Sequence, residues 1–208
     1  MSKQLATPKP AAVAQSESWL PMAILVLAQI QMAFNVNAIP VSMGPIVEQL
    51  GIPATSVGTA LVVYSLFVAA FVMVGSKLGK MFGARLVFQL TALIHGVAMG
   101  IMALSRDANG MNLAQALAGL AAAALVPTLV VLIAANYRGK QQAQALGILA
   151  ATPAISGALA FFVAGFLGTA LSWRYSFAIL FFVSLVVFLL SFRLKPIPRQ
   201  QGIKIDTM

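Results

Sequence analysis

Side chains that could carry out covalent or acid–base chemistry are few and scattered in this sequence. There is one histidine, His95, no cysteine, and four acids that lie far apart, namely Glu17, Glu48, Asp107 and Asp206. A catalytic nucleophile needs a base beside it, and a metal ion needs several ligands around it. No phosphate-binding loop of the form GxxxxGK[ST] occurs either. We therefore expect no enzymatic activity, no metal site and no cofactor.

Uncharged polar side chains within long apolar runs are the remaining candidates for a site. They are Gln31, Asn35, Asn37, Tyr64, His95 and Gln115. Gln31 and Asn35 are four residues apart and share one face of a helix, whereas Asn37 lies well round from Asn35. Each of these groups either hydrogen-bonds to a neighbouring helix or lines a water-filled cavity, and both interpretations stay open. His95 is either a proton or ligand site, because imidazole titrates near pH 6.5, or a neutral side chain bonded to another helix.

The elements that position these residues are predicted to be membrane-spanning helices. Of the 208 residues, 61% are hydrophobic and 8% are charged, whereas soluble domains carry about 25% charged residues. Apolar runs of about 20 residues are long enough to cross a bilayer. We identify six, at approximately 19–42, 56–76, 86–105, 112–136, 145–170 and 172–193. The sequence thus predicts an all-α membrane protein embedded in the lipid bilayer.

The positive charges predict the orientation of these spans. Eleven of the 13 cations lie in the N-terminal segment, the second and fourth gaps and the C-terminal segment, and the other gaps hold only Arg106 and Arg174. Because cations concentrate on the cytoplasmic side, we expect both termini there. The predicted organisation is a cytoplasmic arm over 1–18, a six-helix bundle over 19–193 and a cytoplasmic tail over 194–208. This distribution of charge is explained by the orientation of the spans in the membrane, so we expect no nucleic-acid partner.

The second gap has a pattern beyond its charge. Residues 75–88 read GSKLGKMFGARLVF, with Gly75, Gly79 and Gly83 at four-residue spacing. We interpret the stretch as a short cytoplasmic loop. Its glycines would allow two helices and a tight turn to approach closely.

Together with Tyr64 upstream, the segment TALVVYSLFVAAFVMVGSKLGKMFGARLVF resembles the second span and following loop of the major facilitator superfamily. The similarity is greatest to its fourteen-span drug:proton antiporter branch. Four later segments are similar to further motifs of that branch, in the same order: ALAGLAAAALVPTLVVLIAANY, QQAQALGIL, LSWRYSF and GIKIDTM. The resemblance covers residues from about 30 to 208.

This resemblance implies an alternating-access carrier in which six spans form one of two bundles around a central cavity. Each bundle is built from a 3+3 inverted repeat. The polar residues named above become candidates for the substrate cavity. The loop motif of the family corresponds here to Leu78, Lys80, Gly83 and Arg85. The resemblance further implies the bacterial inner membrane as the location.

The sequence departs from the family at charged positions. The acid of the loop motif falls on Lys80, and the intramembrane arginine of the fourth span falls on Gln115. The Gly-Pro pair of the fifth-span antiporter motif falls on Ala160 and Phe161. A proton carrier needs a group that loads and unloads near neutral pH, which amides cannot do. Proton coupling through these six spans alone is therefore not expected.

The leading functional hypothesis is half of a major facilitator carrier that exports small organic compounds. Six spans supply only part of the cavity wall, so a second six-helix bundle must come from a longer native chain, a homodimer or another subunit. Two alternatives stay open. One is a non-transporting scaffold or assembly subunit derived from a carrier half, and the other is an inactive truncated fragment.

Overall fold

The computed structural model describes residues 18–196. The predicted cytoplasmic arm falls outside this range except for residue 18, as does the tail from residue 197 onward. Seven helices occur within the described range: α1 Leu20–Val41, α2 Met43–Leu50, α3 Ala54–Phe82, α4 Ala84–Leu104, α5 Ala108–Asn136, α6 Gly139–Ala170 and α7 Arg174–Ser191. All of them except α2 are long and apolar enough to cross a membrane. The prediction of six spanning helices is confirmed.

Local sequence signals set several of the helix ends. Pro21 occupies the first turn of α1, where its missing N–H leaves no hydrogen bond unmade. Gly51 ends α2 with a φ of 62°, a backbone conformation that side chains with a Cβ rarely adopt. Asp107 caps α5, its carboxylate oxygen accepting a hydrogen bond of 2.8 Å from the Gly110 N–H.

Three details of the predicted elements are wrong. The fifth span was predicted over 145–170, but α6 already begins at Gly139. The stretch 75–88 is not a loop, because α3 continues through Phe82 and α4 begins at Ala84. Only Gly83 interrupts the helices, with a φ of 94°. Hydropathy marks where apolar residues end, but the helix runs on through Lys77 and Lys80 into polar surroundings. The short helix α2 was also not predicted, since its eight residues fall where we placed the end of the first span and a gap.

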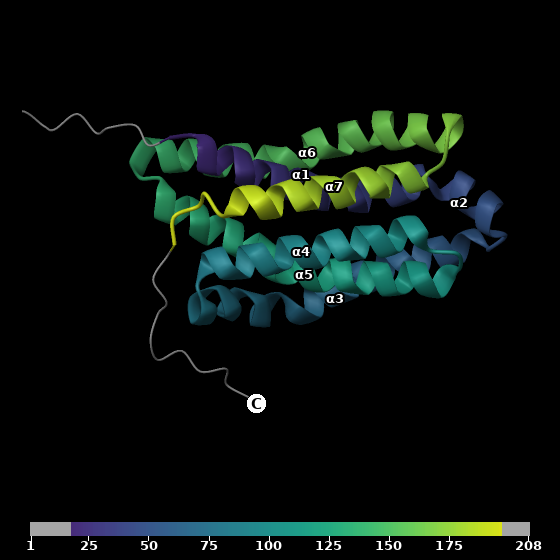
Figure 1. The fold of residues 1–208 in the computed structure, drawn as a ribbon, viewed down its shortest axis with the longest axis horizontal. Helices are drawn as coiled ribbons and strands as arrows, with labels where there is room; N and C mark the ends of the chain where they lie inside the picture. Colours follow the sequence, from purple (N-terminus) through teal and green to yellow (C-terminus); the bar gives the residue numbers. More distant parts are fainter. Residues whose placement is uncertain (1–17, 197–208) are drawn as a thin grey trace, which may run out of the picture.

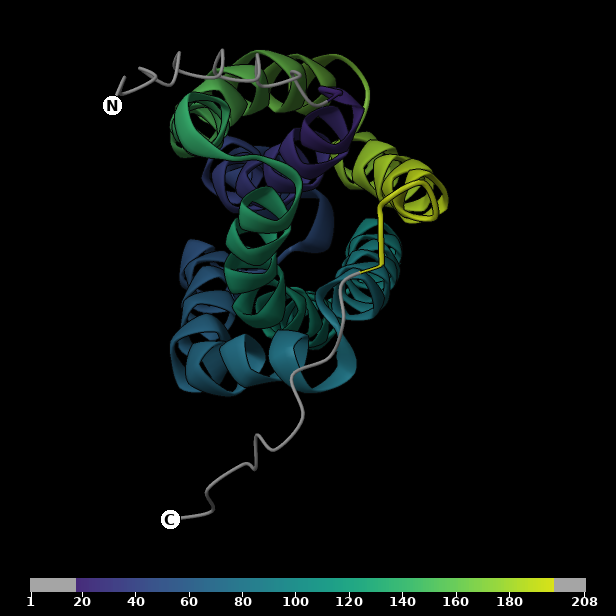
Figure 2. The ribbon, with the colours of Figure 1, turned by 90° about the vertical axis from the view of Figure 1, so that its left-hand side faces the viewer.

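The six long helices form two layers of three. In one layer α1 packs on α6 and α7, and in the other α5 packs on α3 and α4, with α4 and α7 in contact across the layers (Figures 1 and 2). Exchanging α1 with α5, α3 with α6 and α4 with α7 reproduces this set of contacts. The packing therefore has the two-fold character of a 3+3 repeat, in which the first helix of each triplet packs with the other triplet.

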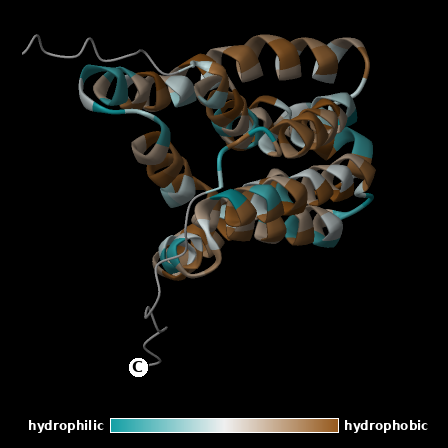
Figure 3. Ribbon diagram, turned by 60° about the vertical axis from the view of Figure 1, so that its left-hand side comes forward, coloured by the Kyte–Doolittle hydropathy of each residue, from teal (hydrophilic) through white to brown (hydrophobic). Residues whose placement is uncertain are grey.

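Hydrophilic residues gather at the two ends of the bundle, and the middle of each long helix is mostly hydrophobic (Figure 3). The end where α1 begins and α7 finishes carries only cations among the described charged residues: Lys77, Lys80, Arg85, Arg138, Lys140, Arg193 and Lys195. The opposite end carries Glu48, Arg106, Asp107 and Arg174. The charge asymmetry on which the orientation was predicted thus separates the two ends of the fold.

Candidate functional site

A closed pair of amides links α1 to α5 in the interior of the bundle. The Asn35 Nδ2 group donates to Gln115 Oε1 at 3.0 Å, and the Gln115 Nε2 group donates to Asn35 Oδ1 at 3.1 Å. Both side chains are fully buried. An unpaired amide in apolar surroundings loses its hydrogen bonds to water without replacement. Reciprocal pairing avoids this penalty. It also joins α1 to α5, which are equivalent helices in the two halves of the 3+3 repeat.

A second polar cluster joins α1, α7 and α4. The Ser184 hydroxyl donates to Gln31 Oε1 at 2.7 Å, and Ser184 Oγ lies 3.5 Å from His95 Nδ1. All three side chains are buried. Because the serine proton is directed to Gln31, the serine oxygen is left to accept from His95 Nδ1–H. Within the described residues, Gln31 Nε2 and His95 Nε2 have no hydrogen-bond partner.

The remaining predicted polar residue of α1 has different surroundings. Asn37 is half-buried and donates to the Ala33 carbonyl at 2.7 Å. Its amide lies beside Gly157 of α6, where an added Cβ would be 3.6 Å from Asn37 Oδ1. The polar residues of α1 therefore contact three different helices: Gln31 contacts α7, Asn35 contacts α5 and Asn37 contacts α6. The sequence predicted one shared face for Gln31 and Asn35 and a different face for Asn37, but it did not predict these partners.

Tyr64 lies at a close approach of α3 and α5. It is buried, and a Cβ added at Gly119 of α5 would be 2.5 Å from the Tyr64 carbonyl oxygen. Real Cβ atoms do not approach this closely, so only glycine fits at position 119. Further along α3, a Cβ added at Gly75 would lie 2.7 Å from Ala124 Cα of α5. The predicted role of Gly75 in close helix packing is confirmed.

The residues of the loop motif lie at the junction of α3 and α4. Leu78 is half-buried, Lys80 is exposed on the last turn of α3, and Gly83 is buried at the turn itself. The Arg85 guanidinium donates to the Phe192 carbonyl at 2.7 Å. Arg85 thereby connects the start of α4 to the end of α7. The motif thus holds helix ends in place and does not reach the amide pair.

Sequence reasoning missed three polar residues that connect helices. Ser184 bridges Gln31 and His95, and the Ser156 hydroxyl donates to the Ile30 carbonyl at 2.7 Å, joining α6 to α1. The Tyr137 hydroxyl accepts from the Met22 N–H at 2.9 Å and donates to the Ser18 carbonyl at 3.0 Å, which caps the start of α1. A serine in an apolar run is the one available signal, but its partner depends on tertiary packing.

The described residues include no group of three or more His, Asp or Glu side chains that could hold a metal ion. The site is accordingly a set of neutral hydrogen-bonding groups inside a helical bundle. Its chemistry is hydrogen bonding between neighbouring helices.

Comparisons with known proteins agree with this architecture. The family model of the Major Facilitator Superfamily matches residues 25–206. Puromycin resistance protein pur8 of Streptomyces alboniger is 26% identical over 185 residues, covering 88% of this chain and 37% of that protein. Methyl viologen resistance protein SmvA of Salmonella typhimurium is 28% identical with the same coverage of both chains. The chain therefore spans 37% of the length of these two relatives.

A solved structure shares the fold. The crystal structure of the peptide transporter POT in complex with sulfate superposes with a TM-score of 0.74, covering 88% of this chain and 39% of that one. The two sequences are 12% identical, so the likeness concerns the fold.

Proposed function

This chain belongs to the Major Facilitator Superfamily, and from that premise we propose that its six long helices form one bundle of an alternating-access carrier that exports small organic compounds. The chain is an integral membrane protein of a transporter family, and its relatives include two resistance proteins. The proposal adds the direction of transport, the class of substrate and the need for a second bundle.

The observation that carries the proposal is the exposure of α3 and α6, the helices on the two flanks. In an 18-residue apolar stretch of each helix, only 17% is buried in α3 and 22% in α6. The corresponding buried share is 56% in α1 and 61% in α5. Small residues lie exposed on both helices, at Ala69 and Ala70 of α3 and at Gly147, Ala154 and Ala158 of α6. Small residues let helices approach closely within a membrane. These two flanks are where we expect a second bundle to pack.

The polar groups inside this bundle are uncharged, and we infer that the part of the substrate site formed by this bundle is neutral. Among the described residues, no carboxylate lies within a spanning helix, since Glu48 is in α2 and Asp107 precedes α5. We infer that Gln115 and Asn35 exchange their mutual hydrogen bonds for bonds to water or substrate when the bundles rock. Any group that carries a coupling proton is assigned to the second bundle. The compounds after which the relatives are named, puromycin and methyl viologen, are the first substrates to test.

The cationic end of the bundle is proposed to face the cytoplasm, in a bacterial inner membrane. Reporter fusions at residue 107 and residue 139 test this orientation, because these positions lie at the α4–α5 and α5–α6 junctions, at opposite ends of the fold. An alkaline phosphatase fusion should be active at residue 107 and inactive at residue 139. The reverse pattern would overturn the orientation.

Transport is tested in inside-out vesicles that contain the chain together with its native membrane partners. Methyl viologen and puromycin should accumulate above the level of vesicles lacking the chain. Gln115→Ala should reduce accumulation by about tenfold, which corresponds to about 1.4 kcal/mol. Gln49→Ala is the matched control, because Gln49 is exposed on α2. Accumulation equal to that of control vesicles for every organic compound tried would refute the carrier proposal.

The second bundle is tested by cross-linking. These 208 residues contain no cysteine, so a single thiol introduced into them reports one position. Ala69→Cys on α3 and Ala154→Cys on α6 should form cross-links to a second copy or another subunit, whereas Val186→Cys on α7 should not. A stoichiometric partner unrelated to carriers, recovered without any transport activity, would favour the scaffold alternative instead.

A further inference from the structure

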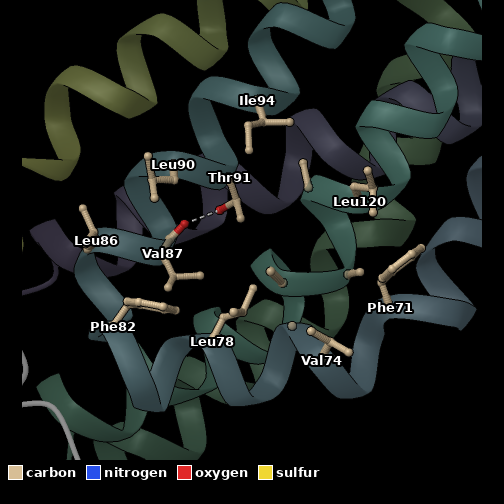
Figure 4. Close-up of a pocket in the computed structure, with 14 residues that line it drawn as sticks. Phe71, Val74, Leu78, Phe82, Leu86, Val87, Leu90, Thr91, Ile94 and Leu120 are labelled. Atoms are coloured by element: carbon tan, nitrogen blue, oxygen red, sulfur yellow. Dashed lines mark hydrogen bonds between the residues drawn. The ribbon is translucent and has the colours of Figure 1, made fainter. Parts of the chain in front are cut away.

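An apolar groove lies between α3, α4 and α5 (Figure 4). Helices α3 and α4 lie on the opposite side of the bundle from α6 (Figure 2). The volume of the groove is about 390 Å³. Leu78 and Val74 of α3 form one wall, and Leu86 and Leu90 of α4 form the other. The turn at Gly83 closes the groove at the cationic end of the bundle.

Small residues contribute to the lining of the groove. They include Gly75 of α3 and Ala121 and Ala124 of α5, whereas most of the other lining residues are large. Gly75 brings α3 against the backbone of α5, where an added Cβ would lie 2.7 Å from Ala124 Cα. Because both α3 and α4 are held against α5, neither can move inward to fill the space between them.

The side chains that line the groove offer an occupant no available hydrogen-bond donor. Thr91 is the single residue with a polar side chain among those that line the groove. Its hydroxyl already donates within α4, to the Val87 carbonyl at 2.8 Å (Figure 4). It also lies 3.0 Å from the Phe88 carbonyl. A polar ligand would lose its hydration here without compensation. The chemistry of the groove fits a hydrocarbon chain.

The closed end of the groove lies at a corner of the bundle that carries only positive charge among the described residues. Lys80 and Arg85 flank the turn at Gly83 within three residues. The bond from Arg85 to the Phe192 carbonyl brings the end of α7, with Arg193, to the same corner. The described acids, Glu48 and Asp107, lie at the opposite end. This charge is complementary to a phosphate without a compensating ammonium group.

We propose that the groove binds one acyl chain of an anionic phospholipid, whose headgroup lies at the cationic corner formed by Lys80, Arg85 and Arg193. Basic pockets between membrane helices bind anionic headgroups in this way. The lipid completes the surface of the bundle where α3 and α4 diverge, and its retention does not depend on transport. The competing occupant, a helix of a second bundle, is an outcome of the test.

The test uses the absence of cysteine from these 208 residues. Val74→Cys, at the wall of the groove, is labelled with a fluorophore in nanodiscs that contain the chain and its native partners. Brominated phosphatidylglycerol and brominated phosphatidylcholine are then titrated as quenchers. Val186→Cys on α7 is the matched control, because valine 186 is 46% exposed, compared with 38% for Val74, and lies outside the groove.

We expect the anionic lipid to quench the Val74→Cys label at a several-fold lower mole fraction than the zwitterionic lipid, and the Val186→Cys label to respond equally to both. Lys80→Gln should lower the preference at position 74 by about fivefold, the effect of one cation near a membrane surface. Lys140→Gln, which removes an exposed cation at the α5–α6 turn of the same end, should leave it unchanged. Equal quenching by both lipids at position 74, or no quenching there because protein fills the groove, would overturn the proposal.

Discussion

The amide pair between α1 and α5 gives a prediction that can be worked out from the structure. Replacing Asn35 by leucine removes both hydrogen bonds and leaves the Gln115 amide buried without a partner. Replacing Gln115 by methionine has the converse effect on Asn35. The double variant, Asn35→Leu with Gln115→Met, removes both amides and leaves apolar side chains of similar size.

The expected magnitudes follow from burial and from the number of bonds. Side-chain hydrogen bonds in membrane proteins contribute about 0.6 kcal/mol each, and an orphaned buried polar group costs about 1–3 kcal/mol. Each single variant should therefore lower the free energy of unfolding by about 1–3 kcal/mol. The double variant leaves no orphan, so we expect a loss of about 1 kcal/mol or less. The coupling energy should exceed about 1 kcal/mol.

Equilibrium unfolding in mixed detergent micelles measures these differences, with the fluorescence of buried Trp173 as the signal. Ser65→Ala is the control, because Ser65 is exposed and bonds only within its own helix, to the Leu61 carbonyl at 3.0 Å. Its effect should stay within about 0.5 kcal/mol. Additive losses in the double variant, within about 0.5 kcal/mol, would refute the idea that the two amides depend on each other.

Three further outcomes are expected. Gly75→Ala should destabilise the bundle by more than about 2 kcal/mol in the same unfolding assay, because its Cβ would lie 2.7 Å from a backbone atom of α5. Gly58→Ala is the control and should be neutral or stabilising, because a Cβ added there has nothing within 4 Å. Equal effects of the two substitutions would contradict this reasoning. Tyr137→Phe should cost about 1–2 kcal/mol through loss of the cap at the start of α1, whereas Tyr175→Phe, at an exposed position, should have no measurable effect. Since His95 is the only histidine, nitrogen NMR of its ring is unambiguous; it should show the proton on Nδ1, and a proton on Nε2 alone would show that Ser184 is not bonded as described.

The sequence alone was sufficient for the coarse architecture. Uncharged apolar runs of about 20 residues predict spanning helices, because a helix of that length crosses the hydrocarbon and satisfies its backbone hydrogen bonds within its own segment. The polar gaps between these runs located the ends of the helices to within a few residues, except at α2, at the end of α3 and at the start of α6. At the end of α3 the helix continues past the apolar stretch, and backbone conformation at Gly83, not hydropathy, sets the boundary.

The candidate site depended on tertiary structure. Helical spacing placed Gln31 and Asn35 on one face of α1, but it could not show that one bonds to Ser184 of α7 and the other to Gln115 of α5. Partners 80 and 153 residues apart are chosen by which helices pack together, and that depends on close contacts such as those at Gly75 and Gly119. Sequence thus determined which polar groups are in the membrane, because burial there follows from composition. Only packing decided which groups meet, because a hydrogen bond requires both partners within about 3 Å.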